Sequence, residues 1–209
     1  MLRAAGPVLD GAAPGASLVR RSLCAVLLAL GTLLCLTGPV AASDTIDVRS
    51  AELRRDADGG GLVLDAAFDF DLPWALEDAV SRGVPLYFVV DFELYRSRWY
   101  WFDERRASAS LTYRLSYSPL TREYRLARGT LALPFGTLRE ALATLRRVSG
   151  WTVVEPGTLS PGPSYWAQVR MRLDTTQLPR PFQIGASTGR DWTLASEWRN
   201  VPVVPELAR

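Results

Sequence analysis

The amino-acid sequence predicts a mainly β fold of the β-rich α+β class, an antiparallel β-sandwich with two short helices packed on it. Apolar and polar residues alternate with a period of two over most of the chain after residue 43. Glycine- and proline-containing turn signals separate these runs. Only two stretches combine helical spacing of apolar residues with helix start and stop signals. Because residues 43–209 have the length of one domain, we expect a single core.

The first two strands are predicted to form a hairpin. Ile46, Val48 and Leu53 begin the apolar alternation, and a turn signal follows at residues 58–61. After this turn the even positions are apolar and several odd positions are acidic. The apolar set is Leu62, Leu64, Ala66, Phe68 and Phe70, and the acidic set is Asp65, Asp69 and Asp71. This pattern predicts a strand with one buried and one wet face.

The stretch from Val84 to Arg106 resembles a strand throughout but is too long for one straight strand. At roughly 3.3 Å per residue it would extend for about 75 Å. Its alternation also changes phase, since Leu94 continues the apolar positions and Arg96 interrupts them. We therefore predict a bulge or corner within residues 95–98, which makes either two strands or one bent strand that serves two sheets.

Two helices are expected. The first begins at Asp71-Leu72-Pro73 and ends at Gly83. The second begins with the capping box of Thr137 and Glu140 and is predicted to end at Gly150. Its apolar stripe consists of Leu138, Ala141, Leu142, Leu145 and Val148, and Arg146 and Arg147 suit a helix C-terminus.

The remaining alternation predicts further strands and two loops. Strands are expected over 111–117, as one or two strands over 124–135, over 164–174 and over 192–198. Composition predicts loops over 156–163 and 177–190.

The N-terminus has the order of an export signal. Arg20 and Arg21 precede the apolar run Ser22–Leu36, and small residues lead to a cleavage site after Ala42. We interpret residues 1–42 as a signal peptide, with retention as an N-terminal anchor as the alternative. Residues 43–209 are then a single exported, periplasmic domain that meets the membrane only if this segment is retained.

The composition excludes several kinds of chemistry. The chain contains no histidine, and its two cysteines, Cys24 and Cys35, lie inside the apolar segment. Zinc sites of the usual kinds and histidine- or cysteine-dependent nucleophiles are therefore not expected. No nucleophile elbow, phosphate-binding loop or dinucleotide fingerprint is present. We predict no catalytic residue, no metal and no cofactor.

The charge balance excludes one class of partner. Residues 43–209 carry equal numbers of basic and acidic residues, so the net charge of +2 comes from the N-terminal segment. Nonspecific nucleic-acid binding requires a clear basic excess, and no nucleic-acid partner is expected.

Carboxylates offer the remaining route to chemistry. Asp65, Asp69 and Asp71 share a strand face and could bind a hard cation or act as a glycosidase-like pair. Asp91 and Glu93 likewise share a face. The favoured interpretation is that both groups solvate outer strand faces.

The candidate binding residues come from two places. The densest aromatic stretch alternates with arginine and could stack a sugar, a lipid head group or a peptide. Its members are Arg96, Arg98, Trp99, Trp101 and Asp103. The alternative is a corner cluster in which arginine stems cover the rings. Arg170 and Arg172 beside Trp166 form the second candidate face, with a ladder of cross-strand ion pairs as the alternative.

Four stretches carry a family resemblance: residues 83–103, 114–126, 169–182 and 191–198. Together they resemble a proteobacterial exported family of unassigned function, domain of unknown function 4390. The resemblance implies a Gram-negative protein that faces the cell envelope. It also implies an accessory role in envelope signalling, because similar proteins are encoded near membrane sensor kinases.

These observations predict a non-enzymatic periplasmic binding or accessory module whose partner is an envelope or inner-membrane protein. One alternative is a protein that binds a small molecule or lipid head group in a pocket between its sheets. Another is a carboxylate-dependent glycan hydrolase. That enzyme needs two carboxyl groups about 5–9.5 Å apart and one carboxyl with a raised pKa.

Overall fold

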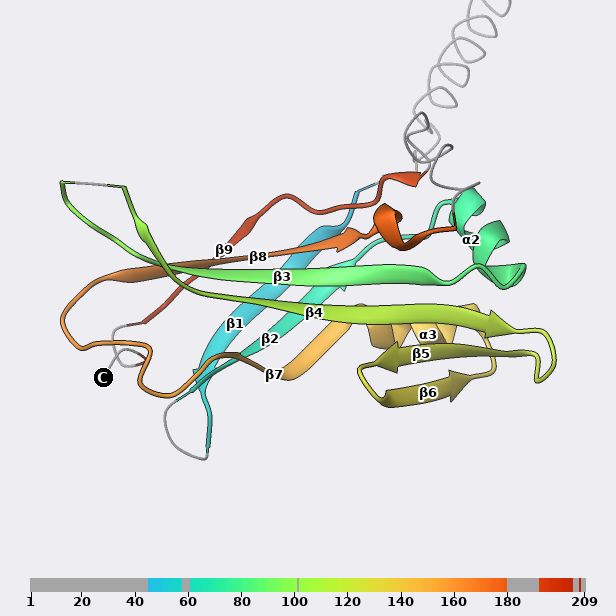
Figure 1. Cartoon of the computed structure of the whole chain (residues 1–209), viewed down its shortest axis with the longest axis horizontal. Helices are drawn as coiled ribbons and strands as arrows, with labels where there is room; N and C mark the ends of the chain where they lie inside the picture. The colour runs from blue at the N-terminus through green and yellow to red at the C-terminus, as the bar shows by residue number, and fades with distance from the viewer. Residues whose placement is uncertain (1–44, 58–60, 101, 180–191, 205–206, 208–209) are drawn as a thin grey trace, which may run out of the picture. The chain divides into compact units, whose positions relative to one another are not determined.

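The computed structural model describes residues 45–57, 61–100, 102–179, 192–204 and 207. Within these residues the strands form two antiparallel sheets, which confirms the predicted sandwich (Figure 1). The smaller sheet has the order β1–β2–β7, from β1 (Asp47–Arg55), β2 (Leu62–Asp69) and β7 (Arg147–Val154). The predicted export segment, Trp101 and most of the predicted loop 177–190 lie outside the described residues.

The larger sheet has the order β6–β5–β4–β3–β8–β9. Its strands are β3 (Leu86–Arg96), β4 (Glu104–Ser118), β5 (Glu123–Arg128), β6 (Leu131–Phe135), β8 (Tyr165–Leu173) and β9 (Arg199–Val201). β3 lies at the centre and pairs with β4 on one side and β8 on the other. Side chains on β3 therefore meet partners from β4, the next strand in the chain, and from β8, which is about 70 residues further along the sequence.

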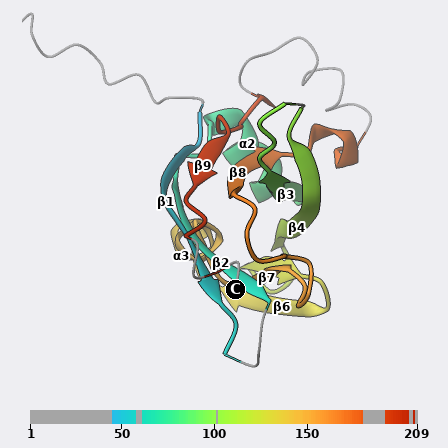
Figure 2. The same ribbon diagram turned by 90° about the vertical axis from the view of Figure 1, so that its left-hand side faces the viewer.

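The core lies between the two sheets. The apolar positions expected on β2, β3 and β8 are buried in one continuous cluster. Figure 2 shows β1 and β2 on one side of this core and β3 and β4 on the other. Phe88 and Phe92 of β3 are fully buried, and Phe88 stacks on Phe70, with 5.7 Å between ring centroids. The alternation thus identified the inward face of each of these strands.

The long stretch 84–106 forms two strands. β3 ends at Arg96, and β4 begins at Glu104. Leu94 pairs with Ala107 and Tyr95 pairs with Arg105, so one extra residue bulges from β4. The two-strand alternative is confirmed, but the bulge lies at Arg106 of β4 and not within residues 95–98, where β3 keeps its register with β8 up to Arg96. The strand expected over 111–117 is the C-terminal part of the same β4.

The first predicted helix is confirmed. α2 (Trp74–Ser81) buries Leu76, Ala79 and Val80 against the core. Gly83 follows with φ of +90°, a conformation that glycine adopts without steric cost. This residue allows the chain to leave the helix and enter β3.

The second predicted helix is correct at its start and wrong at its end. In α3 (Leu138–Leu145) the Thr137 hydroxyl accepts a hydrogen bond from the backbone N–H of Glu140, at 3.3 Å. The helix does not continue to Gly150. Instead, the backbone N–H of Phe68 donates to the carbonyl of Arg146 at 2.8 Å, and β7 begins at the next residue.

Pairing with β2 explains why the helix stops early. Val148 pairs with Ala66 and is buried in the sheet, so its apolar side chain serves a strand. Gly150 has φ of +65° and lies opposite a register shift between Leu64 and Ala66. Its backbone N–H donates to Asp65 at 2.8 Å. Gly150 is therefore a bulge residue and not a helix stop.

The strand predicted over 192–198 is also wrong, because the C-terminal strand is β9, at residues 199–201. Leu194 and Ser196 are buried as the alternation requires, yet only Ala195 forms isolated bridges within the described part of that segment. The Ser196 hydroxyl accepts from the backbone N–H of Met171 at 3.0 Å. A side chain thus takes a position that a backbone carbonyl would occupy in a regular ladder.

The connection from β7 to β8 contains the predicted loop 156–163. Among the described residues, no helix has both the length and the apolar character required to cross a bilayer.

Candidate functional site

The turn between β3 and β4, residues 97–103, carries exposed aromatic side chains and is called the hairpin tip below. Trp99, Tyr100 and Phe102 are 93%, 69% and 86% exposed. The rings of Trp99 and Tyr100 meet edge to face, with centroids 5.0 Å apart. Figure 1 shows this hairpin at its left-hand side. The described aromatics of the tip thus face solvent and do not form a buried corner cluster.

Polar contacts fix the base of the tip. Asp103 accepts a hydrogen bond from the indole N–H of Trp166 at 2.7 Å and from the backbone N–H of Arg98 at 3.3 Å. Glu104 binds the guanidinium groups of Arg98 and Arg106, and these hydrogen bonds lower its pKa. The carboxylates at the base therefore already have hydrogen-bond partners within the domain, while the aromatic rings of the tip do not pack in the core.

Trp166 connects the tip to the sheet. Its ring stacks on Tyr95, with centroids 4.5 Å apart and an angle of 11° between the ring planes. Tyr95 and Trp166 pair directly across β3 and β8. The tip is thus anchored to a rigid pair on the outer face of the larger sheet.

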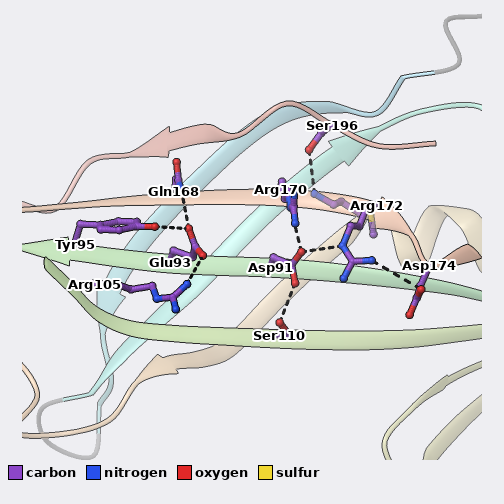
Figure 3. Close-up of polar contacts among 11 residues, drawn as sticks. Asp91, Glu93, Tyr95, Arg105, Ser110, Gln168, Arg170, Arg172, Asp174 and Ser196 are labelled. Atoms are coloured by element: carbon purple, nitrogen blue, oxygen red, sulfur yellow. Dashed lines mark hydrogen bonds and ion pairs between the residues drawn. The ribbon is translucent and has the colours of Figure 1, made fainter. Parts of the chain in front are cut away.

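Asp91 organises a polar network on that outer face (Figure 3). Its carboxylate accepts hydrogen bonds from Ser110 at 2.8 Å, Arg172 at 3.0 Å and Arg170 at 3.1 Å. Burial by itself would raise the pKa of Asp91, but these three donors outweigh burial and leave the pKa lowered.

Glu93 forms a second node of the network two residues further along β3. It accepts from the Tyr95 hydroxyl at 2.7 Å, from Gln168 at 2.8 Å and from Arg105 at 3.1 Å. Burial opposes the ionised form here as well, and the three hydrogen bonds again lower the pKa. The general acid of a glycan hydrolase needs a raised pKa, whereas the pKa values of Asp91 and Glu93 are both lowered.

The sequence-predicted binding residues fall into separate groups. Arg98, Trp99 and Asp103 lie together in the hairpin tip. Arg170 and Arg172 lie in the network around Asp91, as the ion-pair alternative expected, and Arg170 also covers the ring of Trp198 at 4.4 Å.

Arg96 belongs to neither group. It pairs in register with Tyr165, whose side chain is buried, and strand alternation therefore places Arg96 on the core-facing side of the sheet. Trp101 lies outside the described residues.

The acidic group of β2 and the residues that follow it lies at the surface, as the favoured interpretation expected. Asp65, Asp69 and Asp71 each pair with a different arginine: Arg54, Arg49 and Arg146. The described residues contain no cluster of three or more histidine, cysteine or carboxylate side chains that could hold a metal ion.

Two clefts were not predicted from the sequence. One of about 330 Å³ lies between residues 45–48 and 195–199. Another, of about 210 Å³, lies between β4–β6 and the α3–β7 region and is called the β6 cleft below. Its lining residues are Tyr113, Leu126, Arg128, Leu131, Leu133, Thr144, Arg147 and Ser149. The sequence contained one sign of the β6 cleft. Arg128 occupies the next alternate position after Tyr124 and Leu126, where a third apolar residue would be expected.

Comparison with known proteins identifies the family without assigning a reaction. No curated protein and no solved structure matches the chain. A family model, Domain of unknown function (DUF4390), matches residues 43–202, which is most of the chain and nearly all of the described domain. The predicted resemblance is thereby confirmed, and the protein belongs to the DUF4390 family.

Proposed function

We propose that this protein is a non-enzymatic binding module of the bacterial envelope, and that its hairpin tip docks onto a partner protein. The observation that carries the proposal is the exposure of Trp99, Tyr100 and Phe102 at one projecting turn. Large aromatic side chains gain most when an interface buries them, and they dominate binding energy in such surfaces. The export-type N-terminus supports the envelope location, with a membrane sensor system as the setting that the family resemblance implies.

The local charge indicates what the partner presents. The arginines at 98, 105 and 106 are matched at the base of the tip by the carboxylates Glu93, Asp103 and Glu104, and each of these arginines is in an ion pair. Those carboxylates already accept hydrogen bonds from groups of the same hairpin or of β8. The complementary surface on the partner is therefore an apolar recess that covers the exposed rings.

The base of the tip favours a preformed surface. Stacking of Tyr95 on Trp166 and the hydrogen bond from Trp166 to Asp103 hold the turn against the sheet. A preorganised turn loses less conformational entropy on binding than a free loop does. Docking of a partner is consistent with this arrangement. If these rings served the core of the domain, they would be buried and not exposed.

A pull-down with a matched control tests the proposal. The exported domain is used to capture proteins from detergent-solubilised envelope, comparing wild type with Trp99→Ala, Phe102→Ala and Trp74→Ala. Trp74 is a suitable control because it is 74% exposed but lies at the start of α2. Loss of a central aromatic anchor weakens binding by about 2 kcal/mol or more, roughly thirtyfold.

We expect a specific partner to be recovered with wild type and Trp74→Ala and to be lost with both tip variants. Equal recovery with Trp99→Ala and Trp74→Ala contradicts docking through the tip. Sedimentation with phosphatidylglycerol vesicles provides a second readout. Vesicle binding that depends on Trp99, without any tip-dependent protein, would assign the tip to lipid and overturn the protein-docking proposal.

A further inference from the structure

At the β6 cleft, the core-facing side of the larger sheet is only partly covered by other elements. Across β4, β5 and β6, one register row joins Leu115, Leu126 and Leu133, and the next joins Tyr113, Arg128 and Leu131. Leu115 and Leu126 are buried, but Leu133 is 41% exposed and Leu131 is 60% exposed. Apolar side chains on the inner face thus continue beyond the area that the described part of the chain covers.

The charge of this cleft is one-sided. Arg128 shares the inner face with Tyr113 and Leu131, and Arg147 contributes a second guanidinium from the start of β7. The lining residues include no carboxylate. Within the described residues neither arginine forms an ion pair, so no carboxylate of this part of the chain neutralises either charge.

The environment of Tyr113 shows where the Arg128 charge acts. Burial raises the pKa of the Tyr113 hydroxyl, and the nearby Arg128 guanidinium opposes that shift. Arg128 pairs in register with Tyr113, so its positive charge lies beside a buried phenol. Such a position favours an anionic group that reaches into the cleft.

We infer that the β6 cleft binds a single-chain anionic amphiphile. Its carboxylate or phosphate group lies between Arg128 and Arg147, and its apolar chain lies on Leu131 and Leu133. The volume of about 210 Å³ is below the usual range for drug-sized ligands, which favours a medium-length chain over a whole phospholipid. This site is separate from the hairpin tip and does not depend on the function proposed for it.

A competing explanation is that Arg128 only protects the sheet from pairing with another chain. Inward-pointing charges near sheet edges serve that purpose in many proteins. β6 already carries Pro134, which cannot donate to an added strand and so weakens the edge by itself. Protection by Arg128 does not require a second arginine at the cleft, so the presence of Arg147 among the lining residues distinguishes the two explanations.

Isothermal titration calorimetry on the exported domain tests the inference. The probes are decanoate and decyl phosphate, which separate the two possible head groups, with decanol and acetate as controls for chain and charge. The variants are Arg128→Gln, Arg147→Gln and Arg125→Gln. Arg125 is the matched control because it lies on the same strand as Arg128 but is exposed and points to the opposite face.

We expect saturable binding of decanoate or decyl phosphate to wild type, with much weaker binding of decanol and acetate. Arg128→Gln and Arg147→Gln should each weaken binding about tenfold or more, as expected for loss of a charge-assisted hydrogen bond. Arg125→Gln should bind as wild type does. Thermal unfolding confirms that each variant is folded, and Arg147→Gln provides the test if Arg128→Gln is not.

Absence of saturable binding of both anionic probes to folded wild type overturns the inference. The inference is also overturned if folded Arg128→Gln or folded Arg147→Gln binds the anionic probes with the same affinity as the control Arg125→Gln. Sedimentation equilibrium adds an independent outcome: a homodimer that Leu133→Ser dissociates would make the cleft an interface between two copies, which also overturns it.

Discussion

Asp91 lies in the middle of β3, and its side chain is only 14% exposed. The adjacent strands deliver a hydroxyl from Ser110 and guanidinium groups from Arg170 and Arg172 to this one carboxylate. A half-buried charge with three donors is well compensated, but removing it leaves two cations without their common partner. The residue therefore has a structural role on the outer face that its position in a strand pattern did not reveal.

Replacing this carboxylate should destabilise the domain. In Asp91→Asn the neutral amide cannot balance Arg170 and Arg172, and the free energy of unfolding should fall by about 2 kcal/mol. Urea unfolding measures the loss. Asp71→Asn is the control, because the Asp71 side chain is 85% exposed while it also pairs with an arginine.

We expect the control to change stability by less than about 0.5 kcal/mol, as for most surface substitutions. If Asp91→Asn and Asp71→Asn had the same free energy of unfolding, the network would not stabilise the fold, and its polar groups would only solvate the outer face of the sheet. Local reasoning could place Asp91 and Glu93 on one face. It could not identify Ser110 or Arg170 as neighbours, because register depends on which strands pair.

At the scale of elements, the passage from α3 to β7 depends on Gly150. This residue forms the bulge that lets β7 pair with β2 on both sides of Asp65. A glycine at φ of +65° has no Cβ to collide with the neighbouring carbonyl. The same glycine serves equally well as a helix stop by sequence criteria, which is why local rules misplaced the end of the helix.

Substituting this glycine tests the bulge. Gly150→Ala should lower the free energy of unfolding by about 1–2 kcal/mol, because alanine is strained in the left-handed region. No side-chain clash contributes, since no atom lies within 4 Å of the added Cβ. Urea denaturation again provides the measurement.

Gly136→Ala is the control for loss of backbone freedom. Its φ lies outside the left-handed region, and the added Cβ would make only an ordinary contact with the Glu140 side chain. The control should be neutral or slightly stabilising. An equal loss for both variants would show that general glycine effects, rather than the bulge, determine the result.

At the scale of the whole molecule, the carboxylates determine how stability depends on pH. Each described carboxylate with a shifted pKa has that pKa lowered in the folded state: Asp65, Asp69, Asp91, Glu93, Glu104 and Asp174. The chain has no histidine. The unfolded chain thus binds protons at a higher pH than the folded one does, and acid favours unfolding.

The domain should keep a nearly constant stability between about pH 6 and pH 8 and lose stability as the pH falls below about 5. Carboxyl groups titrate near pH 4 in the unfolded chain, so the loss begins there and continues toward the lower folded pKa values. Urea unfolding at a series of pH values measures this profile. Asp91→Asn should have a flatter acid limb than wild type, and a steep change near pH 6.5 would contradict the prediction.

The sequence by itself determined the inward faces of β2, β3 and β8 and the two helix starts. These features are local: alternation with a period of two reports burial, and the Thr137 cap is decided within one helical turn. The aromatic residues of the hairpin tip were also identified from a local pattern, but only the structure showed that they are exposed.

Only the tertiary structure decided which strands meet. It placed β8 beside β3, ended α3 at Leu145 and left Arg128 facing an open cleft. Each outcome depends on hydrogen-bond partners and covering elements that are distant in the chain. Apolar periodicity can state that a side chain faces inward, but the packing of the other elements decides whether anything covers it there.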